Sequence, residues 1–125
     1  MNAIDTARSA YGQPHSAARS PRGIEYDLFA RITGRLSRAW ETRQDDFPAL
    51  AAALHDNSQL WAVLAGDVAD DGNGLPAPLR ARLFYLYEFT THHSRAVLSG
   101  TAGAGVLIEI NTAVMRGLRG NGAAA

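Results

Sequence analysis

The chain has 125 residues and no cysteine, which predicts a single domain and excludes disulfide bonds, thiolate metal sites and thiol nucleophiles. Twelve basic residues, all of them arginine, balance twelve acidic residues, and this zero net charge argues against a general phosphate binder such as a nucleic-acid-binding protein. The chain shows neither a secretory signal nor an apolar stretch long enough to span a membrane, so we expect a cytoplasmic protein.

The first part of the chain predicts a short helix followed by a tether. In residues 1–11, Ile4, Ala7 and Tyr11 recur at helical spacing. Residues 12–22 are rich in glycine, serine and proline, and this composition is typical of a loop. A helix of about ten residues is marginal alone, so we expect it to dock on the rest of the protein or on another chain.

Two longer helical regions follow. The second helix is expected from Pro21 to about Arg43, with an apolar stripe at four-residue steps that ends at Trp40. The next region starts with an N-cap at Asp45 or Asp46 and a proline in its first turn. Because the polar pair at residues 57–58 offers a second cap, residues 45–68 are either two helices that meet at a corner or one bent rod, and two helices are favoured.

An acidic, glycine-rich turn at residues 67–74 leads into a long amphipathic helix at about 77–98, which Gly100 ends. This helix has more large aromatic surface than one stripe can bury. We therefore predict a partner-binding patch, to which we also assign Trp61 from the preceding helical region. The predicted contact residues are Phe84, Tyr85, Tyr87, Phe89 and Trp61. The alternative is that further helices cover these side chains completely.

The small residues at 101–105 predict a flexible hinge before a last helix that starts near Val106. Asn111 lies in register with the apolar stripe of this helix, which indicates a buried amide that hydrogen-bonds a backbone group at a helix junction. Gly117 and Gly120 are expected to end the helix, and residues 121–125 to form a frayed tail. The predicted fold is therefore an all-α, single-domain bundle of about five to six helices over residues 1–120.

No constellation of catalytic or ligand-binding residues can be assembled. His92 and His93 point about 100° apart on a helix and cannot present two metal ligands from one face. The acidic turn does not fit a calcium loop, because Ala69 and Pro78 stand where ligands are required. No nucleophile motif or dinucleotide fingerprint is present. We therefore expect a protein that is not an enzyme and has no catalytic, cofactor or metal site.

Three clusters of residues, in this order and at this spacing, form a specific pattern. They are Asn57 with Leu60-Trp61, Asn73 with Leu75-Pro76 and Leu79-Arg80, and Leu107 to Asn111 with Gly117-Leu118. With these clusters, most of the chain resembles the FlaF family of flagellar biosynthesis regulators from alphaproteobacteria.

The resemblance implies a small helical cytoplasmic protein that is needed for flagellin synthesis and secretion. It implies flagellin as a partner, bound before export, and a translational regulator of the FlbT type as a second partner. A chaperone of this kind requires an apolar groove for a client helix and no catalytic groups. Two alternatives stay open: a regulator that contacts flagellin mRNA directly, and an adaptor that binds only the FlbT-type regulator.

Overall fold

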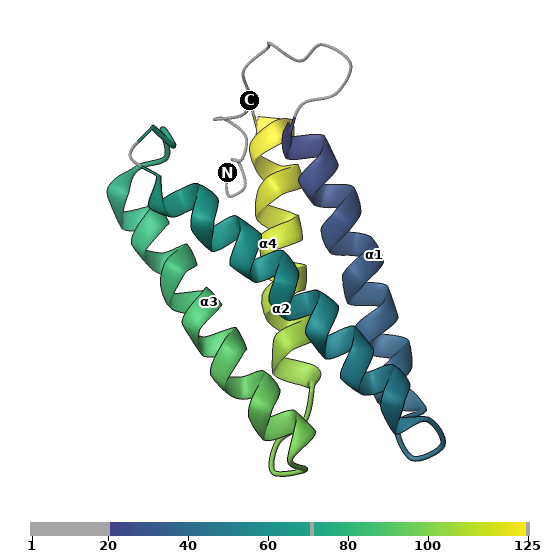
Figure 1. The fold of residues 1–125 in the computed structure, drawn as a ribbon. Helices are drawn as coiled ribbons and strands as arrows, with labels where there is room; N and C mark the ends of the chain where they lie inside the picture. Colours follow the sequence, from purple (N-terminus) through teal and green to yellow (C-terminus); the bar gives the residue numbers. More distant parts are fainter. Residues whose placement is uncertain (1–20, 71, 125) are drawn as a thin grey trace.

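Four α-helices make up the computed structural model, which describes residues 21–70 and 72–124 (Figure 1). They are α1 (Pro21–Glu41), α2 (Phe47–Ala69), α3 (Ala77–Leu98) and α4 (Gly105–Ala124). Helix α2 packs against both α1 and α3, α1 also packs against α4, and α3 and α4 meet over a shorter stretch. In Figure 1, α2 crosses in front of α4 and has α1 and α3 on its two sides.

The all-α class is confirmed, whereas the number of five to six helices is wrong for the described part of the chain. One reason is that residues 47–69 form a single helix instead of two. The short helix at residues 1–11 and most of the tether lie outside the described residues, although positions 21 and 22 of the predicted tether belong to α1.

Helix α2 is continuous because its central polar residue faces the core. Its start is the predicted one, since the Asp46 carboxylate accepts a hydrogen bond from the Ala49 amide at 3.1 Å, next to Pro48. Asn57, one of the two residues expected to cap a second helix, is completely buried. Its Oδ1 accepts a hydrogen bond from Asn111 Nδ2 at 2.7 Å, so the side chain is committed to another helix and does not cap α2.

The corner between α2 and α3 is held by side chains that satisfy the carbonyls at the end of α2. Asn73 Nδ2 donates to the Asp67 carbonyl, and its Oδ1 accepts from the Leu75 amide, both at 3.0 Å. Arg80, from the first turn of α3, donates to the Val68 carbonyl at 3.3 Å. Such bonds replace the helical partners that the last carbonyls of a helix lack.

The connection between α3 and α4 is anchored to the bundle, contrary to the predicted flexible hinge. Gly100 has a φ of +83°, as expected for the residue that closes a helix. Beyond it, Ala104 is fully buried, and His93 Nε2 donates to the Gly103 carbonyl at 2.8 Å. Small side chains do not imply mobility here, because backbone groups and a buried methyl group make the contacts.

Helix α4 ends later than predicted. It continues past Gly117 and Gly120 to Ala124, so these glycines do not terminate it. Among the described glycines only Gly74 and Gly100 have positive φ, so Gly117 keeps helical backbone angles. An exposed glycine inside a helix lowers helix stability by roughly 1 kcal/mol relative to alanine, and the helical preference of the neighbouring residues can outweigh this loss.

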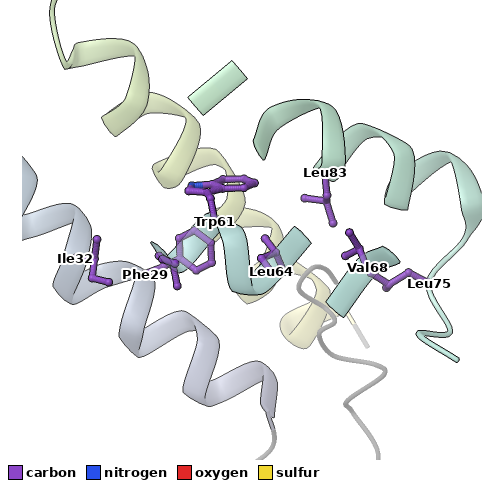
Figure 2. Close-up of a cluster of buried hydrophobic side chains, with 8 residues drawn as sticks. Phe29, Ile32, Trp61, Leu64, Val68, Leu75 and Leu83 are labelled. Atoms are coloured by element: carbon purple, nitrogen blue, oxygen red, sulfur yellow. The ribbon is translucent and has the colours of Figure 1, made fainter. Parts of the chain in front are cut away.

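The hydrophobic core consists of two clusters along the bundle. Figure 2 shows the first, in which the Trp61 ring lies close to Phe29, with ring centroids 5.8 Å apart in an edge-to-face arrangement. Its buried members are Phe29, Ile32, Leu60, Trp61, Leu64, Val68, Leu75 and Leu83. The second cluster contains Leu36, Ala39, Leu50, Ala53, Leu54, Val97, Ala104 and Leu107, and Trp40 packs half-buried against it.

Candidate functional site

A layer of buried polar side chains lies between the two hydrophobic clusters, and Asn111 is its centre. The Asn111 amide nitrogen donates to Thr33 Oγ1 at 3.0 Å and to Asn57 Oδ1 at 2.7 Å, while its oxygen accepts from Trp61 Nε1 at 2.9 Å. One amide of α4 therefore bonds to α1 and, twice, to α2. The prediction of a buried amide at a helix junction is confirmed, but its expected backbone partner is wrong, because all three bonds are made to side chains.

Some buried polar groups, on α2 and on α3, have no hydrogen-bond partner among the described residues. Thr90 is buried, and its hydroxyl oxygen has no hydrogen-bond partner within the described residues; the same holds for Nδ2 of Asn57. Ser94, one turn along α3, donates to the Thr90 carbonyl at 2.8 Å. Because buried polar groups are costly unless paired, the layer restricts which helices can be neighbours and in what register.

The aromatic side chains of α3 do not all face solvent. Tyr85 is 61% exposed and Phe84 is 38% exposed, so both can contact another molecule. Tyr87 and Phe89 are half-buried: the Tyr87 ring lies 5.5 Å from Phe84, and Phe89 stacks on His93 at 5.3 Å. Four of the five predicted contact residues thus lie on α3, and Phe84 and Tyr85 are the accessible ones, although as consecutive helical residues they point about 100° apart.

Trp61 does not belong to this surface. It is fully buried on α2, packed edge-to-face on Phe29 and bonded to Asn111. Direct contact with a partner would require the bundle to open, so we assign Trp61 to the core. The sequence pattern was open to either interpretation, because a tryptophan on an apolar stripe fits a core position and a binding position equally well.

An apolar groove lies between α1 and α2, and the sequence pattern did not predict it. It has a volume of about 280 Å³ and is lined mainly by aliphatic side chains. The lining residues are Leu28, Ile32, Asp56, Gln59, Leu60 and Val63. Val63 is 64% exposed, the largest exposed fraction among the big hydrophobic side chains described. The sequence offered one signal for this groove, which is that Val63 lies outside the main apolar stripe of its helix.

A second hollow, of about 270 Å³, lies between α2 and α3 and is more polar. Its lining includes His55 and Arg95 as well as the exposed Leu98. The hydroxyls of Thr91 and Ser94 in its wall already donate to the carbonyls one turn earlier in α3. The remaining polar donors are thus few, and this hollow has less apolar surface than the α1–α2 groove.

Near the C-terminal end of α2, the surroundings of Asp67 disfavour ionisation of its carboxyl group. Partial burial raises the pKa of Asp67 above its usual value, and the neighbouring carboxylate of Asp70 raises it further. Both acids lie near the negative end of the helix dipole, which also disfavours ionisation.

Within the residues that the structure describes, no three histidine or acidic side chains gather to hold a metal ion. None of the four described helices is long and apolar enough to cross a bilayer.

These features define a small helical protein whose described part is a bundle of four helices with a polar layer in its core and exposed apolar side chains on α2 and α3. A family model described as flagellar protein FlaF matches residues 7–118 of the chain. The chain therefore belongs to the FlaF family of flagellar proteins. No match was found among curated proteins or among solved structures.

The residues that carry the family resemblance are mostly structural in this protein. Asn57, Trp61 and Asn111 form the polar layer, and Asn73 and Arg80 hold the α2–α3 corner. Leu60, Leu75 and Leu107 belong to the two hydrophobic clusters. These motif residues explain why the chain adopts this bundle, and the exposed surfaces must be considered separately for function.

Proposed function

We propose that this protein binds flagellin in the cytoplasm and supports its synthesis and export by protein–protein contact, without catalysis. The membership in a family of flagellar proteins supports the link to flagellum assembly. The observation that carries the proposal is the exposed pair Phe84 and Tyr85, since large aromatic side chains are enriched where proteins bind one another.

The proposed contact is an amphipathic helix of flagellin that lies along α3. Tyr85 and Phe84 offer apolar surface, and the ring of the half-buried Tyr87 lies 5.5 Å from that of Phe84. Rigid aromatic side chains lose little conformational entropy on binding, so a small patch can contribute most of the binding free energy. A FlbT-type regulator is a second proposed partner, through which translation of flagellin would be affected.

The experiment is a calorimetric titration of the full-length protein with its own flagellin. The double variant Phe84→Ser/Tyr85→Ser should bind at least about tenfold more weakly, as expected when central aromatic contacts are removed. Phe47→Ser is the matched control, because Phe47 is similarly exposed, at 47%, but lies at the start of α2. Equal affinity of the double variant and the wild type would reject α3 as the contact surface, and no binding by the wild type would reject flagellin as the partner.

Direct contact with flagellin mRNA is a second candidate, supported by exposed arginines on α1. Arg31, Arg35 and Arg38 lie along one side of this helix, but Arg35 forms an ion pair with Asp56 and Asp27 is close by in sequence. The charge available for phosphate is therefore small. Retention of flagellin mRNA by the protein in a filter-binding assay at low salt, lost at higher salt, would favour this candidate over flagellin.

A further inference from the structure

The α1–α2 groove lies on a different helix pair from the aromatic side chains proposed to bind flagellin. Its lining includes Leu28 of α1 and Asp56, Leu60 and Val63 of α2. Beyond the groove, Arg31, Arg35 and Arg38 continue the Leu28 side of α1, and Asp67 continues the Val63 side of α2, at three- and four-residue spacing. The two helices run in opposite directions (Figure 1), and the ion pair of Arg35 with Asp56 places these two residues at the same level.

The charges at the two ends of this groove are opposite in sign. Asp67 lies about 10 Å beyond Leu60 along α2, since an α-helix rises ~1.5 Å per residue. Arg38 lies about 10 Å from Leu60 in the other direction, one turn past the Arg35–Asp56 pair. Both side chains are exposed, and neither has an ion-pair partner within the described part of the chain. The surface is thus apolar in the middle. It is basic at one end, where Arg38 lies on α1, and acidic at the opposite end, where Asp67 lies on α2.

A surface with this pattern is complementary to itself. A two-fold axis through the middle of the groove brings the basic end of one copy to the acidic end of the other. The middle, where Val63 is 64% exposed, then meets the same aliphatic residues of the second copy.

We propose that the α1–α2 groove is the contact surface of a homodimer in which Val63 packs at the centre and each Arg38 pairs with Asp67 of the second copy. The face formed by two helices of this length is about 30 Å long and about 20 Å wide. It would bury roughly 1,200 Å² in total, at the lower end for specific interfaces. The dimer is therefore weak, with a dissociation constant on the order of micromolar, and it dissociates on dilution.

Sedimentation velocity of the full chain over a range of concentrations, from about 1 to about 200 µM, tests the proposal without any other partner. The wild type should pass from monomer to dimer within this range. Val63→Glu should remain monomeric throughout, because it places a charge at the centre of the interface. Ala113→Glu, an equivalent change at an exposed position on α4, should dimerise like the wild type.

A charge exchange tests the geometry directly. Arg38→Asp and Asp67→Arg should each weaken the dimer at least about fivefold, and the double variant should return to within about twofold of the wild type, because the pair is re-formed with its signs exchanged. Combining Asp67→Arg with Arg116→Asp gives the same net charge without the pair, so this control should stay weak; Arg116 is exposed on α4.

Three results would overturn the proposal. The first is a wild type that is monomeric over the whole concentration range. The second is a dimer that Val63→Glu does not affect, which would place the interface elsewhere. The third is a monomeric wild type whose affinity for flagellin falls with Val63→Glu, which would make the groove a site for the client instead. Loss of flagellin binding alone would contradict the proposed function and leave the dimer intact.

Discussion

Single side chains decide how the four helices fit together, and Asn111 is the clearest example. Its amide satisfies groups on two other helices and has no exposed surface. Asn57 and Trp61 each depend on this one residue for a hydrogen bond in the core. A buried polar residue of this kind contributes less to the free energy of folding than to the choice of one arrangement over others.

Replacing Asn111 with alanine should lower the free energy of unfolding by about 2 to 4 kcal/mol, because it leaves the Trp61 and Asn57 groups unpaired and opens a small cavity. Urea unfolding followed by circular dichroism measures the change. Glu109→Ala, at an exposed position on the same helix, should alter stability by no more than about 0.5 kcal/mol. A similar effect of both substitutions would show that the polar layer contributes nothing specific.

Asp67 should make stability depend on pH. Since the folded pKa is raised, the folded state prefers the neutral carboxyl group, and this contribution is present at low pH and lost as pH rises through the folded pKa. Asp67→Asn should therefore melt at a higher temperature than the wild type at pH 7, and the difference should shrink to nothing as pH falls below the usual range for aspartate. A variant that is less stable than the wild type at pH 7 would contradict the assigned cause.

At the scale of the elements, helix ends depend on local chemistry that a sequence can show. The cap of α2, the glycine after α3 and the proline-containing first turns all lie where the pattern predicted. The pattern left Asp45 and Asp46 as alternatives for the cap, and the structure selects Asp46. The pattern failed at Asn57, whose side chain is suited to capping but instead accepts a hydrogen bond from Asn111 on another helix.

The two adjacent aspartates provide a matched pair for the cap. Asp46→Ala should lower the free energy of unfolding by about 1 kcal/mol, because the Ala49 amide loses its acceptor. Asp45→Ala should change it by less than about 0.5 kcal/mol. Thermal or urea unfolding of the two single variants measures both values, and equal effects would mean that general charge near the helix start, not the cap bond, is responsible.

Two glycines should respond to alanine in opposite directions. Gly100 has a φ of +83°, where an L-residue is strained, so Gly100→Ala should destabilise by about 1 kcal/mol. Gly117 lies inside α4 with open space around it, so Gly117→Ala should stabilise by up to about 1 kcal/mol. Urea unfolding compares them, and destabilisation by Gly117→Ala would indicate that this glycine is needed for a contact.

At the scale of the whole molecule, two hydrophobic clusters are joined by one polar layer. Each cluster takes residues from several helices, so neither can form while the helices are apart. The layer links them through Asn111, which lies one turn from Leu107 of the second cluster and bonds to Trp61 of the first. The bundle should therefore behave as one cooperative unit.

Unfolding should accordingly be a single transition. Near-ultraviolet circular dichroism, which reports mainly on the packing of Trp61 and Trp40, should give the same urea midpoint as far-ultraviolet circular dichroism, which reports helix content. Loss of the aromatic signal well before the helical signal would show that the two clusters, or their side chains, come apart independently of the helices.

The sequence by itself determined the all-α class, the starts and ends of most helices, the buried amide at Asn111 and the family to which the chain is similar. These depend on periodicity, capping and turn chemistry, which act over a few neighbouring residues. Only the tertiary structure decided that α2 is one helix, that Trp61 is inaccessible and that Val63 and Leu28 line a groove. The physical reason is that burial depends on which helices become neighbours. Side chains as far apart in sequence as Thr33 and Asn111 settle that choice, and a local pattern carries no information about such pairs.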